Sequence, residues 1–397
     1  MRIAWICHFS DPDVQQNIRP LKMVSQFAPW ISYTLKVFEH CKGVELHIIA
    51  PHEYISEKKE FCKDGVYYYF YNPYIPLWGR HWPGFFKWDK WTNYARNKRI
   101  TRSWIDSIKP DVIHLQGAEN PYYASSVLSL IRAYPVIVNL QRINLSVLAV
   151  GNHRTQVEYS ILNTAKYFTV RTNTMYSDFY SYRPDSKIFM VNYAMPEYSP
   201  LGAVKEYDIV FFGQVCQAKG IEDLLDAMGI VSSQINPVSL CIIGQVNGTY
   251  QEQLSQRVAS FGLSVKLSWM GRLAKLGDVH KIASKAKISV LPTYNDIISG
   301  TIIESMQLGL PVVSYKTGSI PELNEDSENV LLSDRGDVVG LAKNILRLLT
   351  DDDLYRTMSQ RGIECIKERY SNQNVLQQHL DCYREVIADF YKDEKQT

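Results

Sequence analysis

The feature that most constrains the fold is an alternation of short apolar runs with stretches of helical spacing, interrupted once near the middle of the chain. The runs in the first half are Arg2–Phe9, Val44–Ala50, Val66–Tyr71, Asp111–Leu115, Val136–Leu140, Tyr167–Arg171 and Ile188–Asn192. The runs in the second half are Asp208–Phe212, Ser239–Ile243, Val265–Trp269, Ile288–Leu291, Val312–Tyr315 and Val330–Leu332. Strands separated by helices need crossover connections, so the pattern predicts a mainly parallel, doubly wound sheet in each half.

The interruption is the segment Met195–Lys205, which holds two prolines and one glycine and has no periodicity. Such a segment is typical of a linker between domains. From Tyr370 onward the sequence predicts one long amphipathic helix that ends in a charged tail. We therefore expect one domain over residues 1–197, a second over 198–371, and a terminal helix with its tail over 372–397.

Composition and charge exclude several classes of protein. With 397 residues and 46% hydrophobic residues the chain can bury a sizeable core, and a net charge of +2 does not indicate a general nucleic-acid binder. The seven cysteines are scattered and form no C-x-x-C pair, which favours a reducing compartment. Neither a signal peptide nor an apolar run long enough to span a membrane is found, so we expect a cytoplasmic protein.

Common motifs for other chemistries are missing from both halves. The sequence contains no G-x-G-x-x-G, no G-x-x-x-x-G-K-[ST], no H-E-x-x-H and no G-x-S-x-G. Their absence argues against a dinucleotide oxidoreductase, a P-loop NTPase, a zinc peptidase and an α/β-hydrolase. No cluster of cysteine and histidine suggests a metal site.

The stretch Asp296–Glu322 carries the clearest candidate site. It predicts a bend at Ser299 and Gly300, then a helix with the carboxylate of Glu304 in its first turn, and then a buried strand. The free N–H groups of Gly300–Ile303 would attract an anion, and the two carboxylates beside them could accept hydrogen bonds from hydroxyls. The alternative is purely structural, because Thr301 and Glu304 form a T-x-x-E capping box that could begin any helix.

A second candidate follows the first strand of the second half. Lys219 and Gly220 stand at the start of a predicted helix, where a lysine opposes the helix dipole unless an anion lies beside it. The alternative is a solvated lysine at a helix start whose dipole is satisfied by Glu222 and Asp223.

Three segments together resemble a known enzyme family. They are FFGQVCQAKGIEDLLDAM, then CIIGQVNG with LSWMGRLAKLGDVHKIASKAKISVLPT, and finally Asp296–Glu322 with its acid-x7-acid spacing, G-x-P-V-V and G-x-x-P-E. In this order they are similar to the retaining glycosyltransferases of the GT-B fold, family 4 (glycosyl transferases group 1). The resemblance covers residues 206–372 well and is weak in the N-terminal half.

The resemblance implies two Rossmann-like domains facing across a cleft, with the C-terminal helix packing back on the N-terminal domain. It implies a hexosyltransferase that moves a sugar, without a metal, from a nucleotide-sugar to a saccharide or lipid-linked acceptor in surface-polysaccharide biosynthesis. Asp296 would lie against the transferred sugar, Glu304 would bind the ribose, and Lys219 would neutralise the diphosphate. The donor-binding residues that it implies are Gly213, Gln214, Lys219, Ser299, Gly300, Thr301, Ile302 and Glu304. The nucleotide-sugar is a substrate, so no cofactor is expected.

The sequence departs from the family pattern at several positions. Asp296 replaces a glutamate, Gln214 stands where an arginine is usual, and the loop after the first strand lacks paired glycines. Gln141 and Arg142, which we assign to the acceptor side, occupy a loop where many members have a histidine. The departures keep two alternatives open, an epimerase or phosphorylase of the same fold, and an inactive glycan- or nucleotide-binding protein.

Residues Trp78–Trp104 hold five of the eight tryptophans, interleaved with seven basic residues. This pattern favours contact with an anionic membrane surface or a lipid-linked acceptor, and the alternative is a helix whose tryptophans pack on the N-terminal domain. His8 and His114 follow or end predicted strands, and we interpret both as hydrogen-bonded loop or core residues rather than as catalytic bases.

Overall fold

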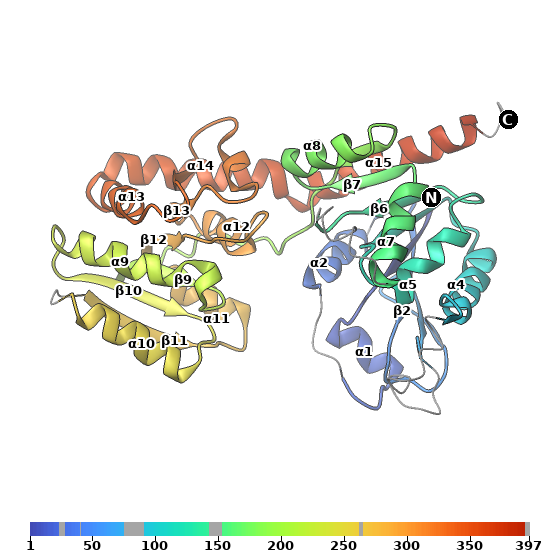
Figure 1. Ribbon diagram of the computed structural model, residues 1–397, viewed down its shortest axis with the longest axis horizontal. Helices are drawn as coiled ribbons and strands as arrows, with labels where there is room; N and C mark the ends of the chain where they lie inside the picture. The colour runs from blue at the N-terminus through green and yellow to red at the C-terminus, as the bar shows by residue number, and fades with distance from the viewer. Residues whose placement is uncertain (24–27, 40, 75–90, 143–152, 262–264, 394–397) are drawn as a thin grey trace. The chain divides into compact units, whose positions relative to one another are not determined.

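The computed structural model describes residues 1–23, 28–39, 41–74, 91–142, 153–261 and 265–393 (Figure 1). The chain divides into two compact units. Unit 1 comprises Met1–Pro196 together with Asn372–Thr397, and unit 2 comprises Glu197–Ser371. The observed division between the two units falls one residue before the boundary expected from the sequence.

Unit 1 is built on an eight-stranded sheet of order β3-β4-β2-β1-β5-β6-β7-β8. Its strands are β1 (Arg2–Cys7), β2 (Glu45–Pro51), β3 (Lys59–Lys63), β4 (Val66–Tyr71), β5 (Val112–Gln116), β6 (Val136–Asn139), β7 (Tyr167–Val170) and β8 (Lys187–Met190). All neighbours pair in parallel except β3 and β4, which form an antiparallel hairpin. The central strands are apolar and buried along their length, as expected for a parallel sheet covered on both faces.

Helices connect the strands of unit 1. They are α1 (Pro12–Ile18), α2 (Pro29–Phe38), α4 (Ala95–Ile108), α5 (Pro121–Ala124), the 3-10 helix η2 (Ser125–Ser129), α7 (His153–Thr164), α8 (Asn173–Tyr182) and α15 (Asn372–Asp393). The last of these comes from the end of the chain and completes the core. Tyr383 of α15 is fully buried and its hydroxyl accepts a 3.0 Å hydrogen bond from the Trp5 indole N–H of β1.

Unit 2 has a six-stranded, fully parallel sheet of order β11-β10-β9-β12-β13-β14. Its strands are β9 (Tyr207–Phe212), β10 (Val238–Ile243), β11 (Val265–Gly271), β12 (Ala286–Leu291), β13 (Val312–Tyr315) and β14 (Val330–Ser333). Its helices are η3 (Gln217–Lys219), α9 (Ile221–Ser232), α10 (Gly248–Ala259), α11 (Leu276–Ala283), α12 (Gly300–Gln307), η4 (Ile320–Asn324), α13 (Val338–Thr350) and α14 (Asp352–Tyr370).

The two doubly wound sheets confirm the predicted fold class. Every strand expected from the sequence is present, and the ends differ from the expected ones by at most two residues. The helix expected over residues 372–397 corresponds to α15, which begins at Asn372. Ser371 adopts an extended conformation at ψ 146°, so the chain breaks there between α14 and α15.

Candidate donor-binding site

The candidate site lies where two neighbouring strands of unit 2 send their connections in opposite directions. β9 and β12 pair in parallel, but β9 is followed by β10 on one side and β12 by β13 on the other. Loops that leave the carboxyl ends of such a strand pair diverge, and ligands of open α/β sheets bind in the space between them. The loops here run from Gly213 to η3 and from Pro292 to α12.

The two loops are joined by main-chain contacts. The Tyr294 N–H donates to the Ala218 carbonyl at 2.9 Å, and the Thr293 hydroxyl oxygen lies 3.3 Å from the same carbonyl oxygen. Gly220 lies so close to Pro292 that a Cβ atom at Gly220 would come within 1.9 Å of the Pro292 carbonyl oxygen. Thr293 and Ala218, which are 75 positions apart in the sequence, are thereby held together.

Lys219 and Asp296 form an ion pair at this junction. The Lys219 ammonium donates to both carboxylate oxygens of Asp296 at 2.7 Å, and the Thr293 hydroxyl donates to one of them at 2.6 Å. The two charged side chains are only 24% and 18% exposed. The structure thus brings together two residues that the sequence analysis assigned to different parts of the donor. The negative charge of Asp296 is compensated by the positive charge of Lys219.

The first turn of α12 follows Asp296 closely in the sequence. Ser299 is the N-cap residue, its side chain accepts no hydrogen bond from the helix, and Gly300 and Thr301 are the first two helical positions. Their N–H groups precede the first intrahelical bond. The Ile302 N–H instead donates to the Ser299 carbonyl at 3.0 Å, so the expected role of Ile302 as a free amide donor is wrong.

The predicted capping box is also wrong. The helix begins at Gly300, so Thr301 lies inside it and Glu304 lies beyond the first turn. The Glu304 carboxylate accepts a 3.0 Å hydrogen bond from His280 Nε2 of α11. Glu304 therefore does not cap its own helix.

His280 is the principal residue of this region that sequence reasoning missed. It is 2% exposed, and its ring contacts the Tyr198 ring edge-on at a centroid distance of 4.0 Å. Its Nδ1 atom has no hydrogen-bond partner among the described residues, so Glu304 is its polar anchor. The sequence offered little signal, because His280 is a single histidine 24 residues before its partner.

Gly213 places the end of β9 beside the first turn of α12. A Cβ atom at Gly213 would lie 3.7 Å from the Thr301 hydroxyl, and one at Gly244 would lie 1.8 Å from the Gly213 carbonyl oxygen. Gln214 follows as an exposed residue. The glycine at the end of β10 thus lets two strand ends approach closely, which leaves the Gly213 loop near the helix start.

A partly buried carboxylate of α9, Asp223, supports the loop from Pro292 to α12. The hydroxyls of Tyr294 and Tyr315 both donate to Asp223 Oδ2 of α9, at 2.6 and 2.7 Å. The bond to Asp223 is the main cause that raises the pKa of Tyr294 to about 12. Asp223 therefore anchors the loop to α9, a role beyond the helix-start contribution expected from the sequence.

The two residues expected on the acceptor side, Gln141 and Arg142, lie in unit 1 after β6. The Gln141 amide donates to the Gln116 carbonyl at 3.3 Å, and Arg142 lies 4.0 Å from the Glu158 carboxylate. Burial raises the pKa of Glu158, while the charge of Arg142 opposes the shift. The remainder of this loop, residues 143–152, lies outside the described residues.

The two histidines considered from the sequence differ in setting. His114 lies inside β5, is fully buried, and its Nδ1 atom is 2.8 Å from the Tyr383 hydroxyl. Burial holds its pKa well below the usual value, which confirms it as a core residue. His8 follows β1, and its Nδ1 atom is 2.9 Å from the Tyr122 hydroxyl.

The aromatic and basic segment Trp78–Trp104 is only partly described, because residues 75–90 lie outside the described ranges. Trp104 of α4 is 6% exposed, and its indole N–H donates to Glu60 at 2.7 Å. Trp91 is 67% exposed. Trp104 thus packs on unit 1, and the expected membrane contact stays a prediction. In the described part of the chain, no helix is long and apolar enough to cross a membrane.

Part of this chain is similar to known glycosyltransferases. The family model for glycosyl transferases group 1 matches residues 199–364. Among curated proteins, N-acetyl-alpha-D-glucosaminyl L-malate synthase of Bacillus anthracis is 22% identical over 44% of this chain and 44% of its own length. The lipopolysaccharide core biosynthesis glycosyltransferase LpsE of Rhizobium meliloti is 23% identical over 45% of this chain and 49% of its own length. The chain thus matches less than half the length of these relatives.

Solved structures resemble nearly the whole chain. Sucrose-phosphate synthase from Thermosynechococcus elongatus has a TM-score of 0.71 at 17% identity and covers 98% of this chain and 100% of its own. Anabaena Alr3699/HepE in complex with UDP has a TM-score of 0.66 at 15% identity and covers 97% of this chain and 100% of its own. The chain has the GT-B fold, and its residues 199–364 match the glycosyl transferases group 1 family.

Proposed function

We propose that this protein is a glycosyltransferase that moves a hexose from a nucleotide-sugar to a saccharide or lipid-linked acceptor, with retention of configuration. The observation that carries the proposal is the ion pair between Lys219 and Asp296, which joins the loop after β9 to the loop that leads into α12. A cation and helix N-terminal amides on one small surface suit a diphosphate. The match of this same region to the glycosyl transferases group 1 model supports it.

In the proposed reaction the chain stabilises the leaving nucleoside diphosphate. As the bond from the sugar to phosphate breaks, negative charge grows on the phosphate oxygens. The N–H groups of Gly300 and Thr301 and the Lys219 ammonium are fixed by the surrounding structure, so they can stabilise that charge without reorganising. Glu304, oriented by His280, would accept hydrogen bonds from the ribose hydroxyls.

The ion pair refines the role first assigned to Asp296. An incoming diphosphate must share Lys219 with Asp296, because the lysine donates to both carboxylate oxygens. We propose that Asp296 orients the Lys219 ammonium toward the phosphates. The Asp296 carboxylate oxygens would also accept hydrogen bonds from the hydroxyls of the sugar. The one-methylene shortening relative to the family's usual glutamate would then be compensated by this pairing.

We propose that the chain's own cation and amides serve the diphosphate without a metal ion. The expected result is that excess EDTA leaves the transfer rate within a factor of two, about 0.4 kcal/mol in barrier. A loss of activity in EDTA that added Mg²⁺ or Mn²⁺ restores would contradict this part of the proposal. The measurement is nucleotide release over time with and without chelator.

The biological setting is proposed from relatives. LpsE is named for lipopolysaccharide core biosynthesis, and a capsular polysaccharide biosynthesis glycosyltransferase, CapM of Staphylococcus aureus, is also similar at 19% identity over 46% of this chain and 47% of its own length. We propose surface-polysaccharide assembly on the cytoplasmic side, with peripheral contact to anionic membrane through residues 78–104. Co-sedimentation with anionic liposomes tests the contact, and equal recovery with neutral liposomes would refute it.

The donor must be identified before the site is tested. Thermal-shift screening of sugar nucleotides should show one donor that raises the unfolding temperature most, since a ligand that binds only the native state stabilises it. UDP-sugars come first, because HepE was solved with UDP. Product analysis then separates the alternatives: free nucleotide with a glycosylated acceptor indicates transfer, an epimerised donor indicates an epimerase, and binding without turnover indicates an inactive relative.

Two substitutions test the site itself. Lys219→Ala and Glu304→Ala should each lower the transfer rate at least about a hundredfold. Losses of this size are usual when one fixed hydrogen-bonding or charged group of an active site is removed. Lys281→Ala is the matched control, because Lys281 is a lysine of α11 whose side chain is 74% exposed. Unchanged circular dichroism would show intact folding. Wild-type turnover in Lys219→Ala or Glu304→Ala would refute the assignment.

A further inference from the structure

We propose that unit 2 contains a binding site for an uncharged aromatic amide or lactam, in a cavity of about 340 Å³ beside the end of α12. The described residues that line it include Tyr198, Pro200, Gln307, Ile363, Ile366 and Tyr370. All of them belong to unit 2, and none is assigned to the donor site. The site therefore does not depend on the proposed transfer reaction.

Two helices of unit 2 contribute to the wall of this cavity. Gln307 is the last residue of α12, and α14 contributes three apolar or aromatic residues, Ile363, Ile366 and Tyr370. The Ser359 hydroxyl of α14 donates to the Gly309 carbonyl, just beyond α12, at 2.7 Å. This bond ties the end of α12 to α14, so this part of the wall is in place before a ligand binds.

The segment that precedes β9 contributes Tyr198 and Pro200. The Tyr198 ring packs edge-on against His280, which is 2% exposed, at a centroid distance of 4.0 Å. A side chain that is already packed on a buried residue loses little further freedom when a ligand binds. The cavity is thus largely preformed, and its volume lies within the range of about 300–1,000 Å³ that is usual for small-molecule sites.

Gln307 is the feature of the wall that points to a ligand. It is 8% exposed and belongs to the same helix as the buried Ile303 and Met306. Its Oε1 atom is buried and has no hydrogen-bond partner among the described residues. A buried acceptor without a donor costs free energy, and such groups are uncommon in native proteins. Because Gln307 lines the cavity, a molecule bound there can supply the missing donor.

An amide or a lactam complements this side chain. The glutamine amide has one acceptor oxygen and two N–H donors. An amide or lactam presents an N–H beside a carbonyl, so the two groups can form a pair of parallel hydrogen bonds. A ketone or an ether can only accept, and it would leave the Gln307 oxygen without a donor.

The remainder of the wall favours an aromatic, uncharged ligand. Ile366 and Tyr370 are buried and Ile363 is half-buried, so these side chains offer apolar surface. The charged residues among the described lining residues, Glu197 and Lys367, are both exposed. A charged ligand would therefore lose its hydration without meeting a buried counter-ion in this wall. Because a cavity of about 150 Å³ holds one benzene molecule, the observed volume has room for one ring with its substituents.

The test is ligand-observed NMR on the full chain, with benzamide as the probe. Dissociation constants from saturation-transfer titrations are compared for benzamide, acetophenone, benzoate and benzylamine, which carry an amide, a ketone, an anion and a cation. Benzamide should bind, and acetophenone should bind roughly fivefold more weakly, the factor that corresponds to one hydrogen bond. Benzoate and benzylamine should also bind more weakly than benzamide. The lactam pyridone should displace benzamide, whereas UDP should not.

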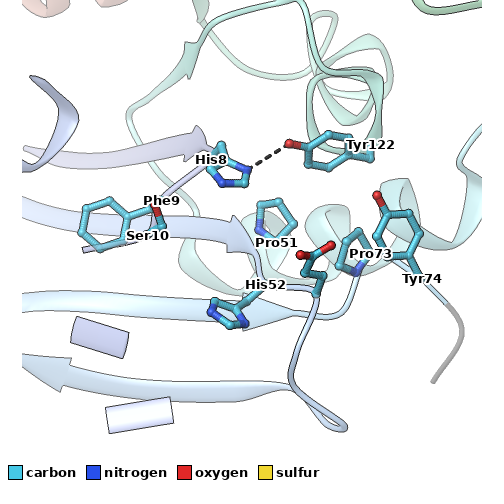
Figure 2. Close-up of a pocket in the computed structure, with 9 residues that line it drawn as sticks. His8, Phe9, Ser10, Pro51, His52, Pro73, Tyr74 and Tyr122 are labelled. Carbon is cyan, nitrogen blue, oxygen red and sulfur yellow. Dashed lines mark hydrogen bonds between the residues drawn. The ribbon is translucent and has the colours of Figure 1, made fainter. Parts of the chain in front are cut away.

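One substitution and two controls locate the ligand. Gln307→Met removes the amide but keeps the length of the side chain, so benzamide binding should weaken roughly fivefold. The unfolding temperature should stay equal or rise, because an unpaired buried acceptor is removed. Gln360→Met is the matched control, since the Gln360 amide bonds Glu364 on α14 at 2.6 Å. Tyr122→Phe is the second control, because it alters the separate cavity of unit 1, where Figure 2 shows Tyr122 beside His8. Both controls should bind benzamide like the wild type.

The proposal is overturned if benzamide does not bind, or if benzoate or benzylamine binds more tightly than benzamide. Displacement of benzamide by UDP would place the ligand in the donor site instead. Loss of binding in Tyr122→Phe would place it in unit 1. Equal binding by Gln307→Met and the wild type would show that the amide of Gln307 does not hold the ligand.

Discussion

At the scale of single residues, the pairing of Lys219 with Asp296 changes what each side chain can do. The Lys219 ammonium is held in a fixed position by its hydrogen bonds to both Asp296 oxygens. The carboxylate also compensates part of the positive charge of the lysine. The affinity of the site for a diphosphate therefore depends on the carboxylate as well as on the lysine.

Asp296→Asn separates the two effects. Removal of one negative charge next to Lys219 should tighten UDP binding, by roughly threefold to tenfold for a partly solvated pair, which is about 0.7–1.4 kcal/mol. Transfer should fall in the same variant, because the lysine loses its orienting partner. Calorimetric titration with UDP and turnover assays measure the two changes. Weaker UDP binding together with unchanged turnover would contradict this account.

His280 is predicted to position Glu304 rather than to contact substrate. His280→Ala should raise the KM for the nucleotide-sugar about tenfold, the equivalent of losing one hydrogen bond to a charged group, with a smaller change in kcat. His280→Gln, which can still donate to the carboxylate, should recover part of the loss. A purely structural role would instead lower thermal stability in both variants without this difference in KM.

The contrast between His280 and Lys219 shows what the sequence could predict at this scale. Lys219 and Asp296 stand within motifs whose order is informative, and the structure joins these two residues in an ion pair. His280 acts through a contact between two helices that are separated by a whole strand, α11 and α12. That contact depends on how the helices pack, which no local pattern encodes.

At the scale of elements, the strands and the start of α12 at Gly300 were predictable, whereas the capping box considered as an alternative is not formed. Apolar runs such as Val312–Tyr315 mark buried strands directly, because both faces of the sheet are covered. The T-x-x-E pattern at Thr301 satisfied a local rule, yet the helix begins earlier, at Gly300. The loop before it is held by a tertiary hydrogen bond from the Ser319 N–H to the Ile297 carbonyl at 2.8 Å.

Gly318 is the element-scale test of that loop. It has φ +53°, and a Cβ atom there would lie 2.0 Å from the Asp296 carbonyl oxygen. Gly318→Ala should therefore destabilise unit 2 by about 1–3 kcal/mol and displace the loop that carries Asp296. Chemical unfolding and a transfer assay measure the two effects.

Gly277→Ala is the matched control for this prediction. Gly277 lies in α11 in an ordinary helical conformation, and nothing lies within 4 Å of a Cβ atom added there. The substitution should be neutral or stabilise unit 2 by up to about 1 kcal/mol, since alanine favours helices over glycine. Equal stabilities for the two variants would show that the contact of Gly318 with the Asp296 backbone is unimportant.

At the scale of the whole molecule, unit 1 is expected to be sensitive to acid. His114 and His379 are fully buried in its core, and burial lowers the pKa of His379 to about 3. Unfolding would restore a pKa of about 6.5, so below that pH the unfolded chain binds more protons than the folded one. Stability should therefore be greatest above about pH 6.5 and fall as the pH decreases toward 3.

Urea unfolding at pH 7.5 and at pH 5.0 measures this loss. Seven of the eight tryptophans lie within residues 1–196, so their fluorescence reports mainly on unit 1. His379→Gln, which cannot be protonated, should be less stable at pH 7.5 but should lose less stability on acidification. A pH dependence identical to that of the wild type would show that His379 does not contribute.

The overall architecture was largely predictable because the sequence marks it with one clear signal. The linker Met195–Lys205 separates two halves with the same alternation of strand and helix, and this fixes the number of sheets. The boundary expected at residue 372 coincides with the first residue of α15, which follows the extended Ser371.

The return of α15 to the core of unit 1 has a consequence for synthesis on the ribosome. Leu380, Cys382, Tyr383 and Val386 belong to the same buried cluster as Trp5, so the first strand meets these partners only after α15 has been synthesised. All of unit 2 is made in the interval, roughly 10 to 40 s at about 5–20 residues per second. Unit 2 can therefore complete its fold first, and a nascent chain released before residue 383 would carry an intact second unit beside an unfinished first one.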